Sequence, residues 1–147
     1  MKIYFSGAIS AGRDHAAIYQ RMVARMQAQG HDVLSAHVAD PAVLQHEADV
    51  PARGVFDRDV KWIEECDVMV AEVSTPSTGV GYEYGLAIQL GKPVLCLYQS
   101  GLRMTKMILG NPAPSLTVAT YSSTAELDEI VDAYLEKLDN EKSHDNQ

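Results

Sequence analysis

Short apolar runs rich in β-branched residues alternate along this chain with segments of helical periodicity, and this alternation restricts the fold more than any other feature. The predicted strands cover residues 2–7, 31–36, 67–73, 92–98 and 115–121. The predicted helices cover residues 13–29, 55–66, the segment from the loop at 74–85 to residue 91, 102–109 and 124–138. Strands that alternate with helices form parallel sheets with right-handed crossovers. We therefore expect the α/β class: a single Rossmann-like or flavodoxin-like domain over residues 1–138, with a five-stranded parallel sheet flanked by helices.

The balance of charges excludes one large class of partner. The 147 residues include 12 basic and 20 acidic side chains, for a formal net charge of −8. Proteins that bind nucleic acid normally present a basic stripe, so no nucleic acid is expected as a partner. A small anion remains compatible with this charge, since a few backbone N–H groups and one arginine suffice to bind a phosphate. The polar segment 139–147 is expected to be a disordered tail.

The chain is predicted to be a cytoplasmic protein. Its first residues, MKIYFSG, lead directly into a predicted strand and lack the features of a signal peptide. No apolar stretch approaches the length of a membrane span, so no membrane is expected as a partner either. Cys66 and Cys96 lie in or beside apolar runs without CxxC spacing, which indicates buried, reduced thiols.

Two glycine-rich loops mark the expected ligand site. In an open parallel sheet, ligands bind at the carboxyl ends of the strands, near the point where the strand order reverses. For a flavodoxin-like order this point lies between the first and third strands, and the loops that follow them are residues 6–14 and 74–85. The second loop does not match the GxGxxG pattern, and the chain contains no Walker A sequence. No cofactor is expected, and no metal, because the five histidines lack ligand spacing.

The second of these loops, STPSTGVGYEYG, has the chemistry of an anion cradle. Ser77 and Thr78 offer hydroxyl groups, and Gly79 to Gly81 allow a ligand to approach the backbone closely at a helix N-terminus. An ordinary N-cap explains Ser77 or Thr78 equally well. Glu83 is expected in the first turn of the helix that follows, where the helix dipole favours an acid and keeps it ionised.

Asp59 is the second carboxylate that calls for an explanation. On the predicted helix it lies in the middle of an arc formed by Val55, Phe56, Val60, Trp62, Ile63 and Cys66, and the opposite face carries Asp57, Arg58, Lys61, Glu64 and Glu65. A carboxylate among apolar residues must be paired, hydrogen-bonded or protonated. It is therefore either a structural acid that braces a loop or pairs with an arginine, or an acid suited to proton transfer. Two carboxylates in different environments are what cleavage of a glycosidic bond requires.

Several segments resemble one enzyme family. The segments IYFSGAI, HVAD, DRDVKWIEECDVMVAEV and PSTGVGYEYGLA are similar to those of the 2′-deoxynucleoside 5′-phosphate N-hydrolases, a branch of the nucleoside 2-deoxyribosyltransferase family. The similarity runs from the first strand to about residue 109. It implies a Rossmann-like domain, a homodimer, and hydrolysis of a deoxynucleoside monophosphate to the free base and deoxyribose 5-phosphate.

The resemblance also implies roles for individual residues. Glu83 matches the nucleophile and Asp59 the acid/base residue, while Tyr4 matches the tyrosine that orients the nucleophile. Ser77 matches the phosphate-binding serine, with Gly79 after it, and Thr105 matches a hydroxyl donated to the phosphate across the dimer. The remaining substrate-binding residues expected are Ser6, Gly7, Ile9, Ser10, Arg13 and His37.

One departure from the family bears on the substrate. Ser10 replaces the arginine that the family has shortly after the first strand, and Arg13 is the nearest remaining positive charge. This loss leaves the choice between ribonucleotides and deoxyribonucleotides open, and the base preference is open as well.

Other functions remain alternatives at this stage. A deoxyribosyltransferase would use the same covalent intermediate but would recognise a free 5′-hydroxyl. A non-catalytic nucleotide-binding or sensor domain would gain nothing from two acids in an anion site. The segment TGVGYE also resembles a loop of the nucleotide phosphoribohydrolases, which cleave nearly the same bond.

Overall fold

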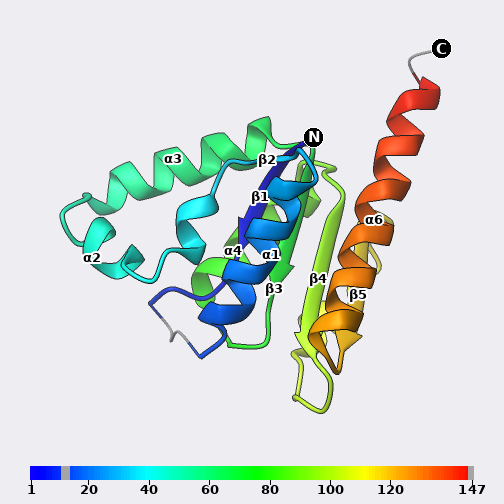
Figure 1. Cartoon of the computed structure of the whole chain (residues 1–147). Helices are drawn as coiled ribbons and strands as arrows, with labels where there is room; N and C mark the ends of the chain where they lie inside the picture. The colour runs from blue at the N-terminus through cyan, green and yellow to red at the C-terminus, as the bar shows by residue number, and fades with distance from the viewer. Residues whose placement is uncertain (11–13, 146–147) are drawn as a thin grey trace.

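The computed structural model describes residues 1–10 and 14–145, and it contains a five-stranded sheet. The strands are β1 (Lys2–Ser6), β2 (Asp32–Val33), β3 (Val68–Glu72), β4 (Val94–Gln99) and β5 (Leu116–Tyr121). They lie in the order β2-β1-β3-β4-β5, and each of these neighbouring pairs is parallel (Figure 1). The predicted α/β class is confirmed, as is the reversal of strand order between β1 and β3.

Helices cover both faces of the sheet. They are α1 (Ala16–Ala28), the 3-10 helix η1 (Ala36–Ala39), α2 (Val43–Ala48), α3 (Ala52–Glu65), α4 (Thr78–Gln89), α5 (Lys106–Leu109) and α6 (Thr124–Asp145). One apolar core lies between the sheet and α1 and α6, and a second lies between the sheet and α3, α4 and α5. The result is a three-layer domain with a core on each side of the sheet.

Strand β1 contributes to both layers because successive side chains point to opposite faces. Ile3 and Phe5 belong to the core under α1 and α6, whereas Tyr4 belongs to the core under α3 and α4. Ser6 follows Tyr4 onto the second face, where its hydroxyl contacts α4. Each of these four side chains is at most 1% exposed.

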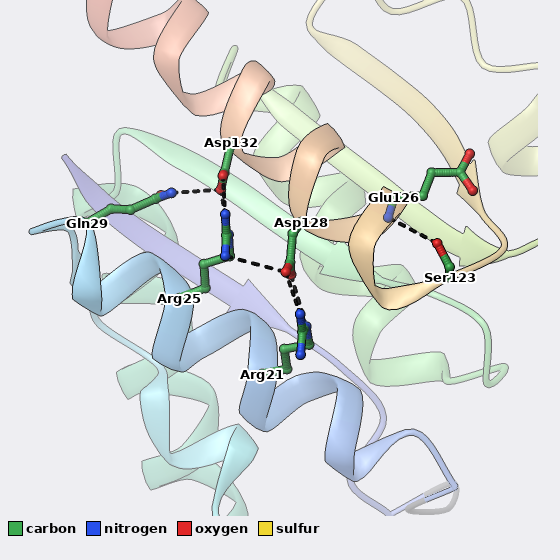
Figure 2. Close-up of polar contacts among 7 residues, drawn as sticks. All are labelled: Arg21, Arg25, Gln29, Ser123, Glu126, Asp128 and Asp132. Carbon is green, nitrogen blue, oxygen red and sulfur yellow. Dashed lines mark hydrogen bonds and ion pairs between the residues drawn. The ribbon is translucent and has the colours of Figure 1, made fainter.

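A row of ion pairs joins α1 to α6 on the first face (Figure 2). Arg21 Nη2 lies 2.6 Å from Asp128 Oδ2, and Arg25 Nη2 lies 2.5 Å from Asp132 Oδ2. Gln29 adds a 2.7 Å hydrogen bond to Asp132. The two arginine side chains remain 46% and 40% exposed, and ion pairs in water are worth less than about 1 kcal/mol each. These contacts therefore fix the orientation of α6 on α1 more than they stabilise the fold.

The region after β1 and α1 differs from the sequence prediction. The predicted strand 31–36 is reduced to Asp32–Val33, because the buried Ser35 hydroxyl takes over the pairing with β1. It accepts a 2.8 Å hydrogen bond from the Phe5 N–H and donates a 2.6 Å one to the Phe5 carbonyl. The following segment, in which no helix was predicted, forms η1 and α2. An ion pair of 2.6 Å between Glu47 of α2 and Arg58 of α3 supports it.

The last helix is longer than predicted. It was expected to end at residue 138, with a disordered tail over 139–147, but residues 139–145 are helical. The polar side chains of this segment find partners: Lys142 forms an ion pair with Asp67, and Lys137 lies 3.9 Å from Glu141 one turn further along. Within the described part of the chain, no helix is both long enough and apolar enough to cross a membrane.

Candidate active site

Glu83 lies at the centre of the candidate site, where α4 faces the end of β1. Its Oε2 atom accepts a 2.5 Å hydrogen bond from the Ser6 hydroxyl, and the Tyr4 hydroxyl also hydrogen-bonds to this carboxylate. The pKa of Glu83 is raised to about 7, mainly by burial and with smaller contributions from the Asp59 and Glu47 charges, while the hydrogen bonds from Ser6 and Tyr4 lower it. A carboxyl with this pKa changes its charge near neutral pH.

This environment corrects the expectation for Glu83. The sequence prediction placed it in the first turn of its helix and held it ionised by the helix dipole. In the structure, α4 begins at Thr78 and its first turn contains no acidic residue. The dipole effect is confined to that first turn. Burial under the neighbouring elements therefore outweighs the helix terminus, and the prediction of a readily ionised Glu83 is wrong.

Tyr4 lies buried beside Glu83 and remains protonated. Burial raises the pKa of its hydroxyl far above the usual range, and the Glu83 and Asp59 charges raise it further. A neutral tyrosine hydroxyl can donate a hydrogen bond to a carboxylate over the whole working pH range. The contact is the one expected of a residue that orients Glu83.

Asp59 and Glu83 share one cavity between α3 and α4. The cavity has a volume of about 410 Å³ and is lined by Ala52, Val55, Phe56, Asp59, Val60, Ile63, Thr78, Gly79, Tyr82 and Glu83. Its walls are mainly apolar, and the two acids are the charged groups among these residues. The rings of Phe56 and Tyr82 lie 6.1 Å apart and are about half exposed, 48% and 55%. An apolar cavity with a few placed polar groups is typical of a small-molecule site.

Asp59 is paired with an arginine that the sequence prediction placed on the opposite face of the helix. Arg58 Nε donates a 2.8 Å hydrogen bond to Asp59 Oδ1. The same guanidinium contacts Glu47 at 2.6 Å and lies 5.0 Å from the centre of the Trp62 ring. The positions of these residues on a helical wheel could not reveal the contacts, because Glu47 lies on α2, a helix absent from the prediction. The apolar surroundings predicted for Asp59 are present on its cavity side.

A second cavity lies on the other side of the first turn of α4. Its volume is also about 410 Å³, and its lining includes Ser77, Thr105 and Arg103. Ser77 is the N-cap of α4 and accepts a 3.3 Å hydrogen bond from Val80 N–H. Thr105 likewise caps α5. The structure thus brings together the two hydroxyl residues expected to bind phosphate, and it shows that capping explains Ser77 as well.

The other predicted substrate-binding residues are spread more widely. His37 belongs to the group around Arg58, at 2.9 Å from Glu47. A Cβ atom on Gly7 would lie 2.8 Å from the Tyr19 ring, so this position requires glycine for packing. Ile9 packs against the core under α1 and α6, and Ser10 is exposed. Arg13 lies outside the described residues.

No candidate metal centre accompanies these residues. Within residues 1–10 and 14–145, no group of three or more histidine, cysteine, aspartate or glutamate side chains is arranged to hold a metal ion.

The sequence of this chain was compared with those of known protein families and individual proteins. The sequence profile of the nucleoside 2-deoxyribosyltransferases matches residues 3–142. The chain is 41% identical to the 5-hydroxymethyl-dUMP N-hydrolase of Rattus norvegicus over 138 residues, which cover 91% of this chain and 84% of the other. It is 36% identical to a Methanosarcina mazei protein that carries the name of a 2′-deoxynucleoside 5′-phosphate N-hydrolase, over 92% of this chain and 84% of the other. The resemblance found in the sequence is confirmed.

A solved structure supports the same fold. The CMP N-glycosidase of Clostridium botulinum superposes with a TM-score of 0.69 at 19% identity, over 91% of this chain and 99% of the other. At this level of identity the likeness bears on the fold alone.

Proposed function

The chain belongs to the nucleoside 2-deoxyribosyltransferase family, and on that premise we propose that its single domain hydrolyses the N-glycosidic bond of nucleoside or 2′-deoxynucleoside 5′-monophosphates. The products are the free base and the sugar 5-phosphate. The observation that carries the proposal is the pair of carboxylates, Asp59 and Glu83, in one cavity. Hydrolysis is favoured over transfer because the relatives at 41% and 36% identity are named as N-hydrolases of nucleoside monophosphates.

The two acids divide the reaction into two steps. In the first, ionised Glu83 attacks the anomeric carbon while the N-glycosidic bond breaks, and the departing base takes a proton from Asp59. In the second, Asp59 accepts a proton from water, and the water oxygen displaces Glu83 from the anomeric carbon. One water molecule is consumed and both acids return to their starting states. With a pKa near 7, a substantial fraction of Glu83 is ionised at neutral pH.

The substrate phosphate is proposed to lie at the first turn of α4. Gly79 lines the cavity of the two acids, Ser77 and Thr105 line the second cavity, and Thr78 lines both. The two cavities therefore adjoin at a helix N-terminus, whose N–H groups favour an anion. Ser77 and Thr105 share their cavity within one chain, and the assignment of Thr105 to the site of a partner subunit stays a prediction.

A panel of substrates tests this function. Nucleoside monophosphates are expected to exceed the matching nucleosides in kcat/KM by about 10²-fold or more, since each charge-assisted hydrogen bond to phosphate is worth roughly 1.5–3 kcal/mol. Ribo- and deoxyribonucleotides of each base would be incubated with the protein, and the released base would be measured by chromatography. Equal activity on nucleosides, with exchange of an added free base, would show a transferase instead. A chain that binds nucleotides and releases no base would be a binding domain.

We further propose that the protein forms a homodimer through the outer surface of α3 and α4. Phe56 and Tyr82 form a half-exposed aromatic pair there, and exposed apolar patches commonly mark interfaces. Gly85 is exposed on α4, and a Cβ atom at this position would contact nothing within 4 Å. A flat helix face beside an aromatic pair suits the approach of a second helix.

The dimer is testable without disturbing the fold. Gly85→Arg is expected to weaken self-association by about 10²-fold, because a charged side chain would be forced into an apolar contact. Sedimentation velocity over a range of concentrations measures the effect, with Ala24→Arg on the exposed surface of α1 as the matched control. A wild-type chain that sediments as a fully active monomer would contradict the proposal.

The state of the cysteines supports action in the cytoplasm. Cys66 and Cys96 are free and buried, and burial raises the pKa of the Cys96 thiol to about 12. Unreactive, reduced thiols are typical of proteins in a reducing compartment.

A further inference from the structure

Arg58 joins three elements around the candidate acid/base residue. Its Nε donates to Asp59 Oδ1 at 2.8 Å, and its Nη2 donates to Glu47 Oε1 at 2.6 Å. The same Nη2 lies 3.2 Å from His37 Nε2, and His37 contacts the same Glu47 oxygen at 2.9 Å. Trp62 packs under both the guanidinium and the imidazole, with its ring centre 5.0 Å from the guanidinium carbon and 5.6 Å from the centre of the His37 ring. The guanidinium is thus held on several sides.

The contact with Arg58 makes the two carboxylate oxygens of Asp59 different from each other. Oδ1 is occupied by Arg58, whereas no hydrogen bond from the described residues reaches Oδ2. The carboxylate also lines the cavity that contains Glu83. The Asp59 side chain is only 17% exposed and that of Arg58 27%, so this pair is less screened by water than a surface ion pair. A fixed Oδ1 leaves Oδ2 as the oxygen that can exchange a proton with a ligand in the cavity.

We propose that Arg58 is a positioning residue for Asp59, which it holds by one oxygen so that the other faces the leaving base and exchanges its proton. Glu47 and His37 act through Arg58: they hold the guanidinium in place from α2 and η1. The inference rests on the proposed function, because a leaving base is needed for the positioning to matter. The position of Arg58 on the polar face of the predicted helix did not indicate this role.

The charges around Asp59 predict how the pH dependence responds. Arg58 is the positive group there, and it pairs with Asp59 and with Glu47 from α2. Asp59 also interacts with Glu83 from α4 and with the neutral Tyr4 hydroxyl from β1. His37 from η1 is the remaining titratable neighbour. The charges of Asp59 and Glu47 already raise the pKa of Glu83, and removal of the guanidinium leaves both without the cation that pairs with them. The acidic limb of the pH profile, on which Glu83 loses its proton, should therefore move to higher pH.

The test compares Arg58→Gln and Arg58→Lys with the wild type. Arg58→Gln is expected to lower kcat about 10-fold to 10²-fold with KM nearly unchanged, because a small misplacement of an acid costs that much. It should also move the acidic limb of the kcat profile to higher pH. Arg58→Lys keeps the charge but lacks the planar fork. It should retain the wild-type acidic limb while losing part of kcat, a split that a merely structural role would not produce.

The control is Arg53→Gln on the same helix, where the side chain is 84% exposed and pairs only with its neighbour Asp57 among the described residues. It should leave kcat and the acidic limb unchanged. Thermal unfolding of each variant shows whether it is folded at the assay temperature. If the wild type is active and the pH profile of Arg58→Gln coincides with the wild-type profile, this inference is overturned and the proposed function is not. A wild-type chain that releases no base from any nucleotide overturns the proposed function and the inference with it.

Discussion

Replacing Glu83 with glutamine is expected to lower kcat by about 10³-fold or more, because an amide cannot attack the anomeric carbon. Glutamine keeps the shape of the side chain and an oxygen that accepts the hydrogen bond from Ser6. Mass spectrometry of the wild type with a slow substrate analogue should detect a covalent glycosyl-enzyme, and the Glu83→Gln variant should not form it. Turnover near the wild-type rate would return Glu83 to the status of an ordinary helix residue.

Stability measurements serve as the control for this variant. The pKa of Glu83 rises from 4.5 to about 7 on folding, so the native state binds more protons than the unfolded state between these values. The free energy of unfolding of the wild type should then fall as pH rises from about 4.5 to 7. The Glu83→Gln variant lacks this loss and should be more stable at pH 8, by up to about 3 kcal/mol. A variant that is inactive yet more stable cannot owe its inactivity to unfolding.

The second large effect is expected at Asp59. Asp59→Asn should slow turnover by about 10²–10⁴-fold, because the asparagine amide cannot give a proton to the base or take one from water. Substrate binding should remain largely intact, so kcat is expected to fall much more than KM changes. Steady-state kinetics on the best nucleotide of the panel measures both parameters.

Two comparisons separate this effect from a general disturbance of the helix. Asp57 lies two residues from Asp59, and its side chain is 56% exposed. The Asp57→Asn variant should therefore leave kcat unchanged. A substrate analogue whose leaving group departs without a proton should be cleaved by the Asp59→Asn variant at closer to the wild-type rate. An equal loss on that analogue and on the natural nucleotide would argue against a proton donor at Asp59.

The layers of the fold could be predicted because apolar strands alternate along the chain with segments of helical periodicity. The short helix α2 could not: an ion pair between its Glu47 and Arg58 of α3 supports it, and no local pattern records a contact between segments. The contacts of Arg58 could not be predicted for the same reason. Its helical position indicates which arc it occupies, but its long side chain reaches Asp59 and a helix that the prediction lacked.

The candidate site also combines features that local sequence predicts with features that depend on contacts between segments. The family resemblance pointed to Glu83, Asp59, Tyr4 and Ser6, and in the structure the alternation of β1 brings Tyr4 and Ser6 onto the face that contacts α4. The charge state of Glu83 was missed because it depends on burial by neighbouring elements, whereas the prediction relied on the nearest helix end. Local sequence therefore identified which acids are present, and only the packed structure indicated how readily each ionises.

The double use of β1 limits how this segment can change during evolution. Ile3 and Phe5 fill one core, and Tyr4 and Ser6, which lie between and beside them, contact Glu83 on the other face. A one-residue insertion or deletion would exchange the two sets, because the side-chain period of a strand is two. It would place phenylalanine against Glu83 and a tyrosine hydroxyl in the apolar core. The length of this strand is therefore constrained by the core and by the candidate site together.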